Sequence, residues 1–69
     1  MNIIKVFGTN VRKYSVRRKI SQEKLAELCG LHRTYISDIE CFRRSISLDN
    51  IQKIADGLEI EVYMLFLEE

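Results

Sequence analysis

Hydrophobic residues recur every three or four positions along most of this chain, which is the spacing of one face of an α-helix. A first helix is predicted over about residues 3–18, with Ile4, Phe7, Val11 and Tyr14 on the apolar face and Lys5, Asn10, Arg12 and Lys13 between them. Two more are predicted over residues 22–30 and 32–41, with inward positions at Leu25, Ala26, Cys29, Leu31, Ile36 and Ile39. A fourth follows Ser47, a good N-cap residue, and carries an apolar face of Leu48, Ile51, Ile54, Ala55 and Leu58. The pattern predicts an all-α fold.

A single glycine separates the second predicted helix from the third. Gly30 can adopt the positive φ that ends a helix abruptly, and Ala26 is small where the next helix must cross closely. Ser21 fits the N-cap of the second helix, and Glu23 is favourable in its first turn. Two short helices joined in this way are typical of a helix-turn-helix.

Residues 60–67 form a nearly continuous apolar run, IEVYMLFL, whose residue types also favour strands. Because a lone strand would leave an unpaired edge in a helical domain, we predict a short fifth helix over about residues 61–67. The run carries more apolar surface than one helix can bury, and exposed apolar patches usually mark interfaces. We therefore predict that residues 60–69 form a homodimer contact, with core packing of the same side chains as the alternative. The predicted contact residues are Ile60, Tyr63, Met64 and Leu67.

The chain has 69 residues, of which 46% are hydrophobic and 30% charged, and we predict one globular domain over residues 1–69. A core of this size gains from a partner subunit. The net charge of +1 hides an asymmetry, because residues 1–44 hold ten Lys or Arg against four Asp or Glu, whereas residues 45–69 hold one against six. A basic half beside an acidic half is expected of a DNA-facing surface with a separate interaction surface, although two solvated faces of opposite sign would give the same distribution.

Several classes of protein are not expected. No apolar run approaches the roughly 20 residues of a membrane span, and the N-terminus lacks the regions of a signal peptide, so we expect a cytoplasmic protein without a membrane partner. Cys29, Cys41 and the single His32 form no recognisable disulfide or zinc pattern, so no metal or cofactor is predicted. Ser37 and Ser45 lack a histidine and a carboxylate at plausible geometry, which argues against an enzyme.

The outward face of the third predicted helix carries side chains suited to DNA. Helical geometry places positions 33, 34, 37, 38 and 41 on one exposed stripe, with Tyr35 at its edge. Arg33 can pair with guanine O6 and N7, a contact worth roughly 1–3 kcal/mol of discrimination, and Thr34 offers a methyl group to thymine. Asp38 would repel phosphate, so it either accepts from cytosine N4 or orients an arginine, and we favour the orienting role.

Together these residues resemble the Xre/Cro family of bacterial and phage helix-turn-helix regulators. The resemblance covers essentially the whole chain and rests on Phe7 and Gly8, SQEKLAELCGL, YISDIE, Arg44, Ser47 and Leu48, Ile54 and Ala55, and Met64, Leu65 and Phe66. The size and the run LHRTYISDIE are most similar to the controller proteins of restriction-modification systems. The resemblance implies a five-helix, lambda-repressor-like domain that binds a palindromic operator in double-stranded DNA as a homodimer, with RNA polymerase as a candidate further partner.

The resemblance also implies which residues bind DNA. Gln22, at the start of the second helix, would bond a phosphate. The third helix would present its base-facing and phosphate-facing residues, which are Arg33, Thr34, Tyr35, Ser37 and Asp38. Arg43 and Arg44 fall in the following loop, and Arg18, near the end of the first helix, could also reach phosphate.

One departure from the family pattern concerns an ion pair. Ser15 stands where the family often has an arginine, which pairs with the glutamate that matches Glu40. Glu40 therefore needs another partner, and the candidates are Arg12, Arg18 and Arg43.

Other departures concern helix ends. Phe42 replaces a usual glycine and Ile46 a usual proline, so we expect the loop after the third helix to differ in conformation. Gly57 and Glu59 replace a small helix former and a helix-ending glycine, which leaves the end of the fourth helix open.

Two functions fit these features. The first is a transcriptional regulator, in particular a controller that times endonuclease expression and regulates its own gene. The alternative is an antitoxin or a phage-type repressor that acts through a protein partner, which the acidic half and the apolar tail would contact. Copurification of a partner would favour the second, and a footprint upstream of the protein's own gene would favour the first.

Overall fold

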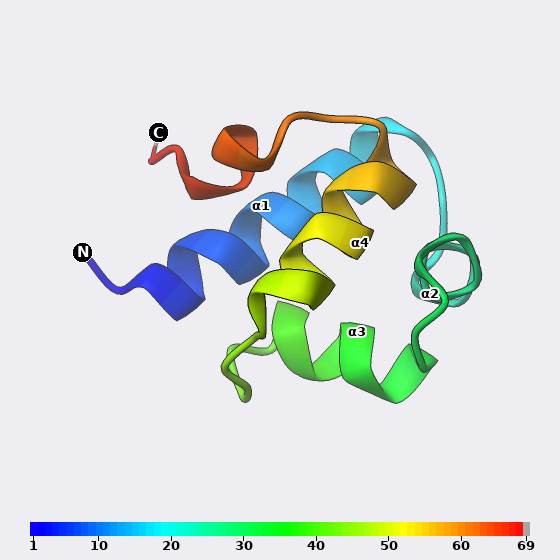
Figure 1. The fold of residues 1–69 in the computed structure, drawn as a ribbon, viewed down its shortest axis with the longest axis horizontal. Helices are drawn as coiled ribbons and strands as arrows, with labels where there is room; N and C mark the ends of the chain where they lie inside the picture. The colour runs from blue at the N-terminus through cyan, green and yellow to red at the C-terminus, as the bar shows by residue number, and fades with distance from the viewer. Residues whose placement is uncertain (69) are drawn as a thin grey trace.

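The computed structural model describes residues 1–68, which form four α-helices followed by a short 3₁₀ helix (Figure 1). The α-helices are α1 (Ile3–Arg17), α2 (Gln22–Cys29), α3 (Arg33–Glu40) and α4 (Leu48–Leu58), and the 3₁₀ helix is η1 (Val62–Phe66). α2 packs on both α3 and α4, α3 also packs on α1, and η1 lies on α1 and α4. The four predicted α-helices are confirmed, and the predicted bounds differ from the observed ones by at most one residue; for α4 the sequence predicts only the start.

Side-chain caps begin three of the four α-helices. Ser21 and Ser47 cap α2 and α4 as predicted, because each hydroxyl oxygen accepts a backbone N–H three residues later, at 3.0 and 3.2 Å. The side chain of Asn2 caps α1 in the same way at 3.2 Å. His32 holds the N-cap position of α3 without a side-chain capping bond.

Each α-helix ends with the same pair of backbone hydrogen bonds, in which one N–H bonds to the carbonyl three residues back and the next N–H to the carbonyl five residues back. This Schellman arrangement requires a residue with positive φ. Those residues are Lys19, Gly30, Phe42 and Glu59, with φ of 59°, 70°, 63° and 57°. Gly30 behaves as predicted, and the end of α4 is set at Glu59, where a glycine is usual.

Apolar side chains from all five elements form the core: Phe7, Val11, Leu25, Ala26, Cys29, Ile36, Ile39, Ile54, Ala55, Leu58 and Leu65. All of them except Leu65 stand at positions that the sequence predicts to face inward. Burial, together with a smaller contribution from the charge of Asp56, raises the pKa of the Cys29 thiol to about 11. Cys29 is therefore a protonated, apolar core residue at neutral pH, whereas Cys41 is exposed.

The tail is helical rather than extended, as predicted, but it forms a single 3₁₀ segment, so a fifth α-helix is not confirmed. The sequence places Asn10 among the polar positions of α1, but this residue is only 3% exposed. Asn10 holds the tail against α1. Its amide nitrogen donates to the carbonyl oxygens of Leu65 at 3.0 Å and Leu67 at 2.9 Å. The ring of Phe66 lies with its centroid 5.3 Å from that of Phe7. A buried amide from α1 thus satisfies carbonyls that a longer helix would have used itself.

The prediction that Leu48 belongs to the buried face of α4 is wrong, because this side chain is 83% exposed. Leu48 is the first residue of α4 and precedes the turns that carry Ile54, Ala55 and Leu58 into the core. Ile51, one turn further on, is half-buried. Helical spacing predicts which face of a helix a residue lies on. It does not predict whether other elements cover that face along the whole length of the helix.

Candidate nucleic-acid interface

The outward face of α3 and the start of α2 meet at a polar hollow. Arg33 and Thr34 are exposed and Ser37 is half-buried, and together with Gln22 they line a hollow of about 190 Å³. All four are predicted DNA-binding residues, one from the first position of α2 and three from α3. The helix pair therefore gathers hydroxyl, amide and guanidinium groups at one place on the surface. Such groups can donate hydrogen bonds to phosphate oxygens and to base edges.

Gln22 is held by Glu40, a contact that the sequence did not predict. Nε2 of Gln22 donates to Oε1 of Glu40 at 3.0 Å, and Nη1 of Arg12 lies 3.4 Å from the same oxygen. Arg12 is one of the three partners predicted for Glu40. The Glu40 side chain is only 3% exposed, and within residues 1–68 its Oε2 has no hydrogen-bond partner. Because a carboxylate can only accept, it directs the amide nitrogen of Gln22 toward itself and ties α1, α2 and α3 together.

Arg44 lies across the ring of Tyr35. Its guanidinium carbon is 4.6 Å from the ring centroid, and its Nη2 lies 3.5 Å from Oδ2 of Asp38. Asp38 therefore pairs with an arginine, as predicted, and that arginine is Arg44. The hydroxyl oxygen of the half-buried Tyr35 accepts a hydrogen bond from Nδ2 of Asn50 at 2.9 Å. Sequence reasoning missed Asn50 because this residue lies on α4, outside the helix pair.

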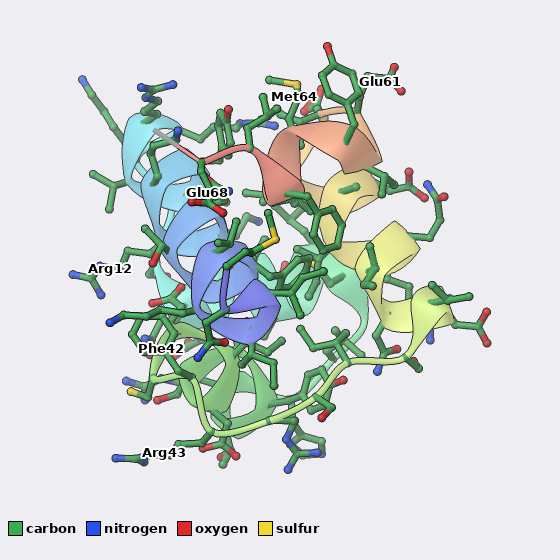
Figure 2. All side chains as sticks on the ribbon, turned by 90° about the vertical axis from the view of Figure 1, so that its left-hand side faces the viewer. Arg12, Phe42, Arg43, Glu61, Met64 and Glu68 are labelled. Atoms are coloured by element: carbon green, nitrogen blue, oxygen red, sulfur yellow. The ribbon has the colours of Figure 1, made fainter. Side chains whose placement is uncertain are left out.

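Arg43 follows a residue with an unusual backbone. Phe42 adopts a φ of 63°, and the next backbone N–H, that of Arg43, donates to the carbonyl oxygen of Asp38 at 2.9 Å. Arg43 then extends outward at the lower end of the molecule in Figure 2. Met64 lies at the upper end of the same view. The predicted DNA-contacting loop and the predicted dimer tail are thus well separated.

Arg18 is not brought to this surface. Its Nη1 donates to the carbonyl oxygen of Leu58 at 2.7 Å, and its Nη2 lies 2.8 Å from Oε2 of Glu59. This end of α4 lies away from α3 (Figure 1). The phosphate contact of Arg18 stays a prediction, while the observed contact stabilises the C-terminus of α4.

The four predicted dimer residues offer a partly exposed apolar surface. Tyr63 is 65% exposed and Leu67 is 48% exposed, whereas Ile60 and Met64 are half-buried. The tail therefore packs on the core with some side chains and leaves others accessible. Its contact with a second subunit stays a prediction.

Residues 1–68 hold no group of three or more His, Cys, Asp or Glu that could bind a metal ion. None of the described helices is both long enough and apolar enough to cross a membrane. Polar side chains converge at the hollow and around Tyr35, which Arg44 and Asn50 contact.

The chain is similar in sequence and in fold to several known proteins. A sequence profile described as helix-turn-helix matches residues 10–65. Control protein C.BamHI from Bacillus amyloliquefaciens is 52% identical over 61 residues, which cover 87% of this chain and 75% of that protein. The crystal structure of the restriction-modification controller protein C.AhdI from Aeromonas hydrophila is similar with a TM-score of 0.89 and 41% identity, over 91% of this chain and 96% of that one. The controller protein C.Esp1396I, solved as a tetramer with its natural 35 base-pair operator, is similar with a TM-score of 0.88 and 29% identity, over 96% and 87% of the two chains.

Proposed function

This chain belongs to the helix-turn-helix family, and on that premise we propose that it is a sequence-specific DNA-binding transcriptional regulator of the restriction-modification controller type. In this role it binds a palindromic operator as a homodimer, regulates its own gene and times the expression of an endonuclease. The similarity to controller proteins over nearly the whole chain supports the controller assignment. A cytoplasmic location follows from the same proposal, and RNA polymerase is a further candidate partner.

The polar hollow is the observation that carries DNA binding. Arg33 stands at the first position of α3, where an arginine can enter a major groove end-on and pair with a guanine. Gln22 stands at the first position of α2, where backbone N–H groups and the helix dipole favour a phosphate. Glu40 holds the Gln22 amide at 3.0 Å and leaves its second N–H to donate to that phosphate.

The first experiment is a footprint on the DNA that flanks the protein's own gene. A two-fold symmetric protected region, with half-sites about 34 Å apart, is expected because the two copies of α3 would enter successive major grooves. Arg33→Ala should then weaken binding and relax one base preference by roughly 1–3 kcal/mol at constant salt. Lys53→Ala removes the same charge from an exposed position of α4 and serves as the matched control. Equal effects of the two substitutions on affinity and selectivity would contradict the docking of α3 in the groove.

The dimer assignment rests on the exposed part of the tail. Tyr63→Asp places a charge at a side chain that is 65% exposed, so the fold should tolerate it while a subunit contact at this residue would not. Sedimentation should then show monomers. Val16→Asp, at an apolar residue of α1 that is 59% exposed, is the matched control and should leave the dimer intact. A dimer that survives Tyr63→Asp would place the subunit contact elsewhere.

The alternative of an antitoxin or a phage-type repressor that works through another protein makes a different prediction. Such a partner would copurify in a fixed ratio and would compete with self-association through the tail. A self-sufficient dimer with a footprint at its own gene supports the controller role instead.

A further inference from the structure

Asn50 connects α4 to the face of α3 that is proposed to read DNA. Its backbone N–H donates to the hydroxyl oxygen of Ser47 at 3.2 Å, which fixes Asn50 in the first turn of α4. From there its side chain reaches Tyr35 on α3, and Nδ2 donates to the phenol oxygen at 2.9 Å. The contact joins residues 15 positions apart in the chain.

The direction of this hydrogen bond decides what the Tyr35 hydroxyl can do next. The amide nitrogen is a donor, so the phenol oxygen acts as the acceptor and its own hydrogen is not used. Within residues 1–68, no group accepts that hydrogen. The hydroxyl is thus left as a donor that lacks an acceptor inside the protein.

The Tyr35 ring is also held from its face. The guanidinium group of Arg44 lies 4.6 Å from the ring centroid and is itself paired with Asp38 at 3.5 Å. Since Arg44 is 46% exposed at its side chain, the phenol and a cation stand together at the edge of the proposed DNA surface. DNA carries hydrogen-bond acceptors on its phosphates and on its base edges, and this pairing of a cation with a donor suits both.

We infer that Asn50 is a positioning residue that sets the Tyr35 hydroxyl as a donor toward a hydrogen-bond acceptor of operator DNA. Asn50 itself touches no DNA in this arrangement and acts through Tyr35 alone. The inference rests on the proposed DNA-binding function and adds to it a residue outside the helix-turn-helix.

A double-mutant cycle with Asn50→Asp and Tyr35→Phe tests whether Asn50 sets the Tyr35 hydroxyl as a donor to DNA. Asn50→Asp keeps the shape of the side chain but leaves it able only to accept, so it would take the hydroxyl hydrogen and turn the hydroxyl away from DNA. Tyr35→Phe removes the hydroxyl outright. The added carboxylate also repels phosphate, and the Tyr35→Phe background measures that repulsion separately. An acidic residue is favourable in the first turn of a helix, so the fold should be retained, and thermal denaturation monitored by circular dichroism checks this.

The probe is a duplex that the native protein selects from a randomised pool, and affinity is measured by fluorescence anisotropy at one salt concentration. Tyr35→Phe should weaken binding about tenfold, as expected for a lost hydrogen bond to a charged or strongly polar acceptor. Asn50→Asp should weaken binding by a factor about five times larger when Tyr35 is present than in the Tyr35→Phe background. Equal factors in the two backgrounds, or unchanged affinity on Tyr35→Phe, would overturn the inference.

Binding to single base-pair variants of the selected duplex identifies the acceptor. If Tyr35→Phe relaxes the preference at one position, the acceptor is a base, whereas an equal loss on all variants indicates a phosphate. If the native protein selects no duplex from the pool, the proposed function itself fails, and this result is distinct from a failure of the cycle.

Discussion

The close contact between Gly57 and Cys29 decides whether Gly57→Ala stabilises or destabilises the protein. Gly57 lies near the end of α4, where alanine would ordinarily stabilise a helix by up to about 1 kcal/mol. A Cβ atom on Gly57 would, however, lie 2.6 Å from Sγ of Cys29, which is buried in α2. Overpacking of a closed core costs about 1–3 kcal/mol. Gly57→Ala is therefore expected to lower the free energy of unfolding by about 1 kcal/mol net.

Removal of the Cys29 sulfur should make Gly57→Ala stabilising instead of destabilising. After Cys29→Ala, the atoms nearest to the new Cβ would be the backbone nitrogen of residue 29 and Cβ of Leu28, both at 3.6 Å, which is ordinary van der Waals contact. In that background Gly57→Ala should stabilise the protein by up to about 1 kcal/mol, because only the gain in helix propensity remains. The coupling energy between the two sites is then about 1–3 kcal/mol.

Urea denaturation followed by circular dichroism measures the four free energies of unfolding. All four proteins must be compared at one protein concentration, since self-association would add to the apparent stability. Gly30→Ala is the contrasting control, because its Cβ would meet nothing within 4 Å and its cost arises from a φ of 70° alone. That cost should be the same with and without the sulfur. If Gly57→Ala changes the stability of both backgrounds by the same amount, the steric explanation is refuted.

Two further predictions concern helix ends. Lys19→Gly should raise the free energy of unfolding by about 0.5–1 kcal/mol, because it relieves a non-glycine φ of 59° at an exposed position. This gain exceeds the cost of the added conformational entropy that glycine gives the unfolded chain. Urea denaturation measures the change, and an unchanged midpoint would contradict the prediction. Arg18→Ala should lower stability by about 1 kcal/mol, because it removes the bonds to Leu58 and Glu59. The dependence of DNA binding on salt concentration should stay unchanged in that variant, whereas a slope reduced by about one with unaltered stability would support the predicted phosphate contact instead.

The sequence predicts the helices and nearly all of the core because both depend on local spacing. Ile36 and Ile39 face inward for the same reason that Arg33 and Thr34 face outward, and burial agrees with both predictions. The turn at Gly30 is equally local, since it requires one residue that accepts positive φ. These features need no knowledge of what packs against them.

The contacts that hold the candidate site depend instead on tertiary structure. Gln22 meets Glu40 across 18 positions of the chain, and no periodicity links the two. Asn10 has the sequence context of a solvent-facing residue and is buried because the tail returns to α1. Leu48 has the spacing of a core residue and yet is exposed at the first position of α4. Spacing predicts the direction of a side chain, and only the packing of the elements decides what it meets.

Phe42 illustrates how a departure from the family pattern can alter side-chain packing while the backbone keeps the conformation that glycine favours. Its φ of 63° costs an L-residue roughly 1–2 kcal/mol. The ring, however, lies against Gly8 of α1, so closely that a Cβ on Gly8 would come within 3.0 Å of it, and the Nζ of Lys5 lies 6.0 Å from its centroid. Burial of part of an aromatic ring in this place offsets the backbone cost. Because Arg43 and Arg44 follow directly, the position of both arginines depends on how Phe42 packs on α1. A Cβ on Gly8 would meet the backbone carbonyl oxygen of Ile39 in α3 as well as the Phe42 ring, so Gly8→Ala should shift both α3 and this loop and weaken operator binding, which fluorescence anisotropy measures.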